Sequence, residues 1–322
     1  MADAVKTPVL AVGCAQLGNL YQARTDAEAE AILAAAWETG VRHFDTAPHY
    51  GLGLSERRLG AFLRGKTRAE FTVSTKVGRL LVPSPETADR PDDEGFAVPA
   101  DRRQVWDFSA AGVRASLDAS RERLGLDRID TVLVHDPNEH AEQARTEAVP
   151  ALVALRERGV IDSVGVGNRD TALLTRFVTE TGIDVVMLAG RHTLLDQTAM
   201  DTLFPACARR GVPVLNAAVF NSGVLADPEP ADDARFEYAA ADPDVLDRAR
   251  RLAALCRRHG TTLPAAALAF AAAHPVVSMI VVGADNAEQV RTNTALLATP
   301  PPRSFWTALA ATGLVRAGAG PR

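Results

Sequence analysis

Four ionisable side chains stand at or just after the ends of short apolar segments, and their types suit hydride transfer. Asp45 directly follows the apolar segment 41–44, Tyr50 lies on the turn beyond it, and Lys76 and His135 end two later segments. A carbonyl carbon that accepts hydride leaves negative charge on its oxygen, which needs a proton donor within hydrogen-bond reach. A tyrosine hydroxyl has a free pKa of about 10. It can fill this role if a lysine ammonium favours its ionisation, a carboxylate holds the lysine, and a histidine orients the same oxygen.

Each of the four residues also has an ordinary structural explanation. Asp45 precedes a threonine, as turn and cap residues often do, and Tyr50 alone is more often a packing residue. A lysine such as Lys76 usually extends its ammonium to solvent, and His135 precedes an Asp-Pro pair typical of a loop. These explanations would all have to coincide at three successive strand ends. The joint pattern therefore favours the chemical interpretation.

The rest of the chain alternates short apolar segments with amphipathic ones, which predicts parallel strands joined by crossover helices. Eight such units favour a single closed (β/α)8 barrel, an α/β TIM barrel, over an open sheet. The expected strands are residues 10–14, 41–44, 71–76, 131–135, 163–166, 185–188, 212–215 and 279–282. The expected helices are residues 26–38, 55–63, 109–124, 145–158, 172–180, 199–209, 244–259 and 287–297. Residues 264–273 are alanine-rich and predict a further, buried helix.

Two segments rich in Pro, Asp and Arg, 79–108 and 226–242, interrupt this spacing. Both follow strands, so we expect long loops on the carboxyl-terminal face, where barrel active sites are built. We expect one domain over residues 1–314 and a flexible tail over residues 315–322. Trp106 and Phe108 in the first loop either close over a substrate or anchor the loop to the barrel.

Composition limits the remaining function classes. The chain has 322 residues, 47% of them apolar, and a net charge of −5 with basic and acidic residues interspersed. Nothing indicates a nucleic-acid or membrane partner, a signal peptide or a transmembrane span. Three widely spaced cysteines predict neither disulfides nor a zinc site, so we expect a cytoplasmic protein without a metal. Its expected partner is a small molecule, and it is expected to be a monomer or small homo-oligomer.

The motifs resemble those of the aldo-keto reductase superfamily over nearly the whole chain. The segments that carry the resemblance are 44–51 with 54–60 (aspartate and tyrosine), 74–78 (lysine) and 123–130 leading to His135. The resemblance implies catalytic roles for Asp45, Tyr50, Lys76 and His135, and a nicotinamide dinucleotide bound without a Rossmann fold. Segments 50–58, 105–109, 188–197 and 219–225 are most similar to the sugar 1-dehydrogenase branch, which acts on L-fucose, D-threo-aldoses or L-galactose. A pyridoxal 4-dehydrogenase has many of the same motifs.

The same resemblance implies a set of binding residues. For the cofactor they are Asn168, Asn221, Ser222, Gly223, Leu225, Gly283, Ala284, Gln289 and Asn293. His49 and Trp106 are expected to contact the substrate. The chain also departs from the family. Ala189 replaces a common carboxamide-binding glutamine, and Ala217 or Ala218 falls where an aromatic usually stacks on nicotinamide.

We therefore expect an NAD(P)-dependent enzyme that oxidises an aldose at C1 to a lactone. NAD is expected to work at least as well as NADP, because residues 283–289 contain no cation and two carboxylates, whereas a 2′-phosphate is best bound by arginine. One alternative is an aldehyde or ketone reductase using the same four residues. Others are a barrel lyase forming a Schiff base at Lys76 and a sensor that holds cofactor without turnover.

Overall fold

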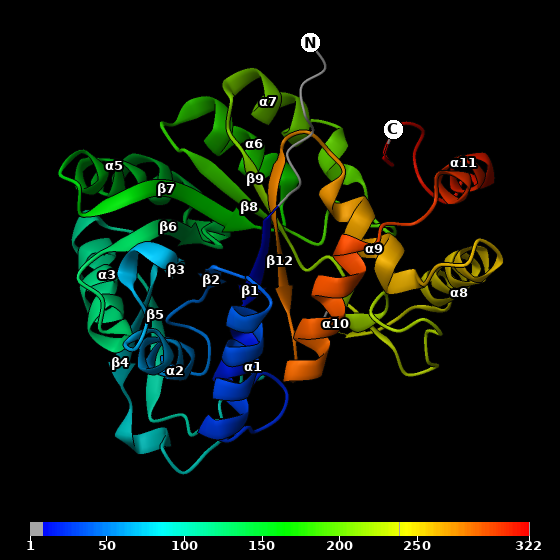
Figure 1. Cartoon of the computed structure of the whole chain (residues 1–322). Coiled ribbons are helices and arrows are strands. Elements are labelled where there is room, and N and C mark those ends of the chain that lie inside the picture. The colour runs from blue at the N-terminus through cyan, green and yellow to red at the C-terminus, as the bar shows by residue number, and fades with distance from the viewer. Residues whose placement is uncertain (1–8, 238, 322) are drawn as a thin grey trace.

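Eight parallel strands close into a barrel in a computed structural model that describes residues 9–237 and 239–321. The order around the barrel is β1-β12-β9-β8-β7-β6-β3-β2, so the first and last strands pair and helices surround them (Figure 1). The strands are β1 (Val9–Gly13), β2 (His43–Asp45), β3 (Thr72–Val77), β6 (Ile129–His135), β7 (Ile161–Asn168), β8 (Val185–Ala189), β9 (Val214–Ala217) and β12 (Val277–Gly283). The predicted (β/α)8 barrel and all eight predicted strands are confirmed.

The helices largely follow the predicted pattern. They are α1 (Asp26–Glu38), α2 (Leu54–Leu63), α3 (Ala110–Leu124), α5 (Val149–Glu157), α6 (Thr171–Glu180), α7 (Leu203–Arg210), α8 (Pro243–Arg258), α9 (Leu263–Ala272), α10 (Ala287–Ala298) and α11 (Arg303–Thr312). The helix expected at 145–158 begins as a π-helical turn, Ala144–Ala148, and the one expected at 199–209 begins as a 3-10 turn, Thr198–Met200. Helix α11 was not predicted.

Local signals explain why several helices begin where they do. At α1 the Thr25 hydroxyl accepts from the Glu28 amide while the Glu28 carboxylate accepts from the Thr25 amide, so two amides that lack helical partners are satisfied. Ser109 caps α3 in the same way, by accepting from the Gly112 amide. These caps fix where the chain leaves the barrel face and turns back along its outside.

The barrel interior is divided into an apolar side and a polar side. Alternate residues of a strand point inward, and the apolar side consists of Ala11, Leu133, Val185, Met187, Leu215 and Val281. The inward positions of β2 and β3 are instead polar: His43, Asp45, Ser74 and Lys76, all buried. The sequence therefore places a line of polar side chains through the barrel beside an apolar filling.

The two long segments contain short strands that the sequence did not predict. In residues 79–108, β4 (Arg79–Pro83) pairs with β5 (Arg102–Trp106) as an antiparallel hairpin (Figure 1). In the second segment β10 (Arg235–Phe236) pairs with β11 (Ala239–Ala240). The tip of the first hairpin folds back, because Leu20 forms a β-bridge with Phe96 and the Tyr21 amide donates to the Gly95 carbonyl. The backbone pairing of this segment thus fixes Phe96 against the loop that follows β1.

A second apolar cluster lies outside the barrel wall. It joins α8, α11 and the buried helix α9, which confirms the helix expected from the alanine-rich run. Val315 and Ala319 belong to this cluster and are 8% and 2% exposed. The domain boundary at residue 314 and the flexible tail beyond it stay predictions. Across residues 9–237 and 239–321, no helix is long and apolar enough to cross a membrane.

Candidate active site

The four predicted catalytic side chains converge at the carboxyl ends of adjacent strands. Asp45 ends β2, Lys76 lies near the end of β3 and His135 ends β6, and these strands are neighbours in the order β2-β3-β6. Tyr50 lies on the turn after β2, whose tight path includes Leu52 at a φ of 51°. Parallel pairing brings residues about thirty to sixty positions apart in the chain to one face, as strand ends in a barrel do.

Lys76 forms the centre of this group. Its Nζ donates to Asp45 Oδ2 at 2.8 Å, to the Thr46 carbonyl at 2.8 Å and to the Tyr50 hydroxyl at 3.2 Å. Lys76 is 2% exposed and Asp45 is 3% exposed. Burial alone would lower the pKa of Lys76, but the Asp45 charge and the bonds to Asp45 and Tyr50 prevail and raise it. The ammonium that lies against the phenol is therefore favoured in its charged form, as the predicted scheme requires.

His135 is held in its neutral form. Burial, followed by the positive charges of Arg79 and Lys76, lowers the pKa of His135 well below 6.5. Its ring centroid lies 6.3 Å from that of Tyr50. A neutral imidazole carries one N–H, so His135 can donate a single hydrogen bond to an oxygen placed beside the phenol.

His49 adjoins the same space. Its ring centroid is 6.0 Å from that of Tyr50 and 6.1 Å from that of His135. Burial, and then the Arg79 charge, lower the pKa of His49 to about 3. Its Nδ1 is buried and has no hydrogen-bond partner among the described residues. Buried polar atoms are usually paired, so this nitrogen suits contact with a substrate oxygen or hydroxyl.

The aromatic ring that covers the tyrosine is Phe96, which sequence reasoning did not single out. Phe96 is 4% exposed, and its ring lies 5.0 Å from His49 and 6.0 Å from Tyr50, measured between centroids. Trp106 is 44% exposed and stacks on the fully buried Phe108 at 5.9 Å. The only sequence signal for Phe96 was its place in the long segment. The hairpin brings it to the site through a backbone bridge that leaves no local pattern.

Several predicted cofactor residues lie on the backbone just after β9. In this stretch Ala218, Asn221 and Ser222 all have positive φ, from 47° to 61°, and Gly223 has a φ of 105°. Non-glycine residues in this region are uncommon and gather at ligand sites. The Asn221 side chain donates to the Gly190 carbonyl, while its Oδ1 is buried without a partner among the described residues. The Leu225 side chain is buried in the second apolar cluster, and its backbone N–H donates to the Phe220 carbonyl at 3.2 Å.

Asn168, at the end of β7, is already partly engaged. Its Nδ2 donates to Asn138 Oδ1 at 2.9 Å, and its Oδ1 accepts from the Asp170 amide at 2.7 Å. One amide hydrogen and one oxygen lone pair remain for a ligand. These two bonds fix the orientation of the amide at the barrel mouth.

The other predicted cofactor residues lie where β12 leads into α10. A Cβ on Gly283 would lie 2.6 Å from Gln16 Oε1, an oxygen that is buried and has no partner among the described residues. Ala284 is 4% exposed, and Gln289 Oε1 accepts from the Asp285 amide at 2.7 Å. Asn293 lies half-buried one turn further along α10. Gln16 was not predicted, and only the packing of β1 beside β12 reveals it.

An arginine outside this segment changes its charge balance. Arg24, which is buried, forms an ion pair with Asp285 and also donates from Nε to the Asp285 carbonyl at 3.2 Å. The expectation that no cation serves residues 283–289 holds for the sequence of that segment but not for its surroundings. Asp285 is thus compensated, and Glu288 is the remaining exposed carboxylate there.

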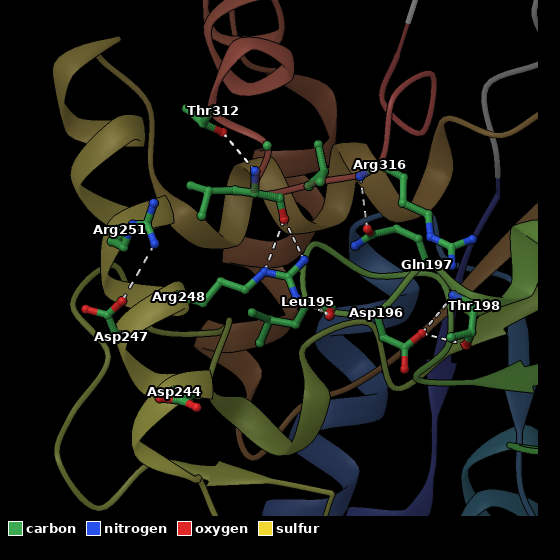
Figure 2. Close-up of a pocket in the computed structure, with 13 residues that line it drawn as sticks. Leu195, Asp196, Gln197, Thr198, Asp244, Asp247, Arg248, Arg251, Thr312 and Arg316 are labelled. Atoms are coloured by element: carbon green, nitrogen blue, oxygen red, sulfur yellow. Dashed lines mark hydrogen bonds and ion pairs between the residues drawn. The ribbon is translucent and has the colours of Figure 1, made fainter.

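A hollow of about 760 Å³ lies away from these residues, between the segment after β8, α8 and the end of α11 (Figure 2). Its lining mixes acids with Arg248, Arg251 and Arg316. Arg248 donates to the carbonyls of Leu195 and Leu314, and so ties the chain after α11 to the segment after β8. None of the predicted site residues lines this hollow.

Among the described residues, no group of three or more His, Cys, Asp or Glu side chains is arranged to bind a metal. All three cysteines are buried free thiols. Burial, and then the Asp45 charge, raise the pKa of Cys14, the thiol beside Asp45 and Lys76. This thiol is therefore kept protonated next to the buried ion pair.

A closed barrel with this polar group at its carboxyl-terminal mouth defines an oxidoreductase acting on CH–OH groups. The chain belongs to the aldo/keto reductase family, whose model matches residues 9–312. It is 47% identical over 319 residues to a D-threo-aldose 1-dehydrogenase of Pseudomonas sp, covering 98% of this chain and 96% of that protein. It is 36% identical to a pyridoxal 4-dehydrogenase of Microbacterium luteolum, over 95% and 94% of the two chains. The structure of aldo-keto reductase AKR11C1 from Bacillus halodurans, 24% identical, superposes with a TM-score of 0.73 over 96% and 92% of the chains, which shows the shared fold.

The chain is also 29% identical to an L-galactose dehydrogenase of Arabidopsis thaliana, over 90% of this chain and 84% of that protein. Together these relatives support the sugar dehydrogenase-like branch of the family. Aldo-keto reductases and aldose dehydrogenases use nicotinamide cofactors. The substrates of this class are small carbonyl compounds and sugars.

Proposed function

We propose that this chain is an NAD(P)-dependent aldose 1-dehydrogenase that oxidises the anomeric carbon of a sugar hemiacetal to a lactone. The observation that carries the proposal is the Lys76 ammonium, fixed by Asp45 and 3.2 Å from the Tyr50 hydroxyl at the barrel mouth. The 47% identity to a D-threo-aldose 1-dehydrogenase over nearly all of both chains supports the choice of a sugar.

In this mechanism Tyr50 is the acid–base group. Its phenolate takes the proton from the anomeric hydroxyl, the C–H electron pair leaves as hydride, and the carbonyl of the lactone forms. The bound nicotinamide supplies the hydride acceptor. Lys76 stabilises the phenolate by its charge, and Asp45 keeps that charge in place. Neutral His135 donates its N–H to the sugar oxygen, which orients the hydroxyl toward Tyr50.

The residues at the barrel mouth fit a dinucleotide. Among the described residues the buried Oδ1 of Asn221 and Oε1 of Gln16 lack hydrogen-bond partners, and the missing Cβ of Gly283 lets the Gln16 amide lie close to the start of α10. We propose that Asn168 serves the nicotinamide end, that the positive-φ segment with Asn221, Ser222, Gly223 and Leu225 holds the pyrophosphate, and that the start of α10, beside Gln16, serves the adenosine. That last group comprises Gly283, Ala284, Gln289 and Asn293.

We further propose that NAD is used at least as well as NADP. A 2′-phosphate at the start of α10 would meet Glu288 and would have to compete with Asp285 for Arg24. Steady-state kinetics with both cofactors on one good sugar test this proposal. A preference for NADP of about tenfold, worth about 1.4 kcal/mol, would refute this proposal.

The Tyr50→Phe variant tests the function directly. Turnover should fall by about 10²–10⁴-fold, because general acid–base catalysis contributes that much, while cofactor binding measured by fluorescence stays near that of the wild type. Tyr21→Phe is the control, since Tyr21 is 51% exposed. A panel of aldoses with both cofactors identifies the sugar. Failure of every aldose, or a Tyr50→Phe enzyme with near-normal rates, would refute the proposal.

The alternative that retains support is an aldehyde dehydrogenase or reductase of the pyridoxal type. The 36% identical relative named for that activity supports it, and Phe96 offers a ring to an aromatic substrate. Pyridoxal belongs in the same substrate panel. A Schiff-base lyase at Lys76 finds no such support, because a nucleophilic amine needs a lowered pKa whereas that of Lys76 is raised.

We also propose a cytoplasmic enzyme that is a monomer or small homo-oligomer. Three buried free thiols suit a reducing compartment. Size-exclusion chromatography with light scattering tests the assembly, and fractionation of the source cells tests the compartment.

A further inference from the structure

Behind the ion pair, a line of hydrogen bonds continues through the barrel toward its opposite end. Ser74 Oγ donates to Asp45 Oδ1 at 2.6 Å, on the carboxylate oxygen that Lys76 does not use. His43 Nε2 lies 3.1 Å from Ser74 Oγ, and His43 Nδ1 lies 2.7 Å from Thr72 Oγ1. Ser74, Asp45 and His43 are all buried, and Thr72 is exposed at the start of β3.

The chemistry of the carboxylate fixes the direction of these bonds. An ionised carboxylate only accepts, so the Ser74 hydroxyl must give its hydrogen to Asp45. Ser74 can then only accept from His43, which places the histidine hydrogen on Nε2. Nδ1 is left to accept from Thr72 Oγ1. Every bond in the line therefore donates toward Asp45, which favours its negative charge.

We propose that Ser74, supported by His43, is a positioning residue that holds the Asp45 carboxylate and thereby keeps the Lys76 ammonium against Tyr50. The inference rests on the proposed function, in which that ammonium sets the pH at which Tyr50 ionises. It concerns the side of the ion pair that faces away from the substrate.

Loss of the Ser74 hydroxyl has the same effect by two routes. If Asp45 turns its orphaned oxygen toward Lys76, the ammonium is drawn away from the phenol. If instead the carboxylate moves into the space that the hydroxyl leaves, it takes the ammonium with it, and the phenol loses its nearby charge. Both changes raise the pKa of Tyr50 above its wild-type value.

The other charged and titratable groups near this line stay in place in such a variant. Facing Asp45 are Lys76 of β3, His43 of β2 and Cys14 after β1. Facing Tyr50 are Lys76, His49 and His135. Burial lowers the pKa of His43, and the charges of Asp45 and of Asp130 on β6 oppose that shift. A change in the ionisation pH of Tyr50 that occurs only when Ser74 is replaced is therefore assigned to the hydrogen bond from Ser74 to Asp45.

The chain offers a matched control on the same strand. Thr75 is as buried as Ser74, points to the opposite face of β3 and donates to a carboxylate, Glu56 Oε1, at 2.7 Å. Ser74→Ala and Thr75→Val each remove one buried hydroxyl-to-carboxylate bond. Only Ser74→Ala removes it from the tyrosine's ion pair, so a general loss of stability affects both and a change in Tyr50 affects one.

Two measurements test the inference. One is the pH profile of kcat for sugar oxidation, and the other is the near-ultraviolet titration of tyrosine hydroxyls in the protein without substrate. In the titration, each variant is compared with the same variant carrying Tyr50→Phe, and the difference is the signal of Tyr50. Ser74→Ala should raise the ionisation pH of Tyr50 by about one unit, a tenfold loss of phenolate below it. Thr75→Val should leave it unchanged, and Ser74→Thr, which keeps the hydroxyl, should restore it. His43→Phe should shift it less than Ser74→Ala, and His43→Gln, which can still donate, less again.

An unshifted Ser74→Ala enzyme, or an equal shift in Thr75→Val, would overturn the inference. If Ser74→Ala does not fold, the two His43 variants provide the test. A larger rise in the ionisation pH of Tyr50 in His43→Phe than in His43→Gln supports the inference, and the absence of that difference overturns it. If the wild type oxidises no sugar, the proposed function fails, and the phenolate titration still decides the role of Ser74.

Discussion

The Lys76–Asp45 ion pair allows stability and catalysis to be separated by mutation. Lys76→Met removes the ammonium and leaves the Asp45 carboxylate, 3% exposed, without its counter-charge. Breaking a buried pair in this way typically costs about 3–5 kcal/mol of unfolding free energy. Burial, then Arg79 and Lys76, lower the pKa values of His135 and His49. Without the Lys76 charge these two histidines bind a proton more readily on acidification, which offsets part of the loss at low pH.

We therefore expect Lys76→Met to be destabilised by about 3–5 kcal/mol at pH 7 and by less at pH 5. The sign is unusual: the deficit relative to wild type shrinks as the pH falls. Buried histidines away from Lys76 weaken both proteins on acidification and cancel in the difference. Urea unfolding followed by tryptophan fluorescence at both pH values gives the two free energies.

The double variant Asp45→Asn/Lys76→Met completes the test. It removes both charges, so it should regain most of the lost stability at pH 7 while its turnover stays as low as that of Lys76→Met. Lys66→Met is the control for a lysine that lies over an aromatic ring, Trp37, instead of against a buried acid. A Lys76→Met deficit that is below about 1 kcal/mol, or that is the same at both pH values, would refute the reasoning about an uncompensated buried carboxylate.

Three further outcomes are expected. Phe96→Ala should raise the Michaelis constant of the best sugar several-fold, whereas Trp106→Ala should leave it nearly unchanged, and equal effects in steady-state kinetics would contradict the assignment of the covering ring. Arg248→Met should lower the free energy of unfolding by about 1–3 kcal/mol, through carbonyls left without a donor, and should expose the chain after α11 to limited proteolysis. Arg251 is half exposed, so Arg251→Met should do neither. If the chain after α11 stays protected from proteolysis in Arg248→Met, the proposed role of Arg248 in holding that chain would be refuted. Burial lowers the pKa of His192 to about 3. Acidification from pH 8 to 5 should therefore lower the free energy of unfolding by about 2 kcal/mol through this residue, because only the unfolded chain binds the proton. Urea unfolding of His192→Leu should show a correspondingly smaller loss over that range.

Patterns in the sequence were enough to predict the barrel and the convergence of the four polar groups. Strand and helix periods are local, so eight alternating units could be read from the order of residues alone. Carboxyl ends of parallel strands share one face, so Asp45, Lys76 and His135 were expected together before any distance was known. Caps such as Thr25 with Glu28 are also local, and the predicted bounds of α1 match the structure.

Elements without a local signature were missed. The strands of the β4–β5 hairpin are separated by the long stretch 84–101, with no short turn motif between them to predict their pairing. The bridge from Leu20 to Phe96 depends on that hairpin, and with it the ring that covers Tyr50. The sequence therefore pointed to Trp106 as an aromatic residue of the long loop 79–108, and not to Phe96.

Only the tertiary structure decided which partner each charged or polar group received. Arg24 and Asp285 lie 261 positions apart, and their ion pair exists because β1 and β12 close the barrel. His43 and Ser74 stand in line behind Asp45 because β2 and β3 pair in a fixed register. Residue types and periods are properties of short stretches, but hydrogen bonds and burial depend on side chains that folding brings within a few ångströms. The sequence thus determined which groups could do the chemistry, and the packing of the strands decided how each is held.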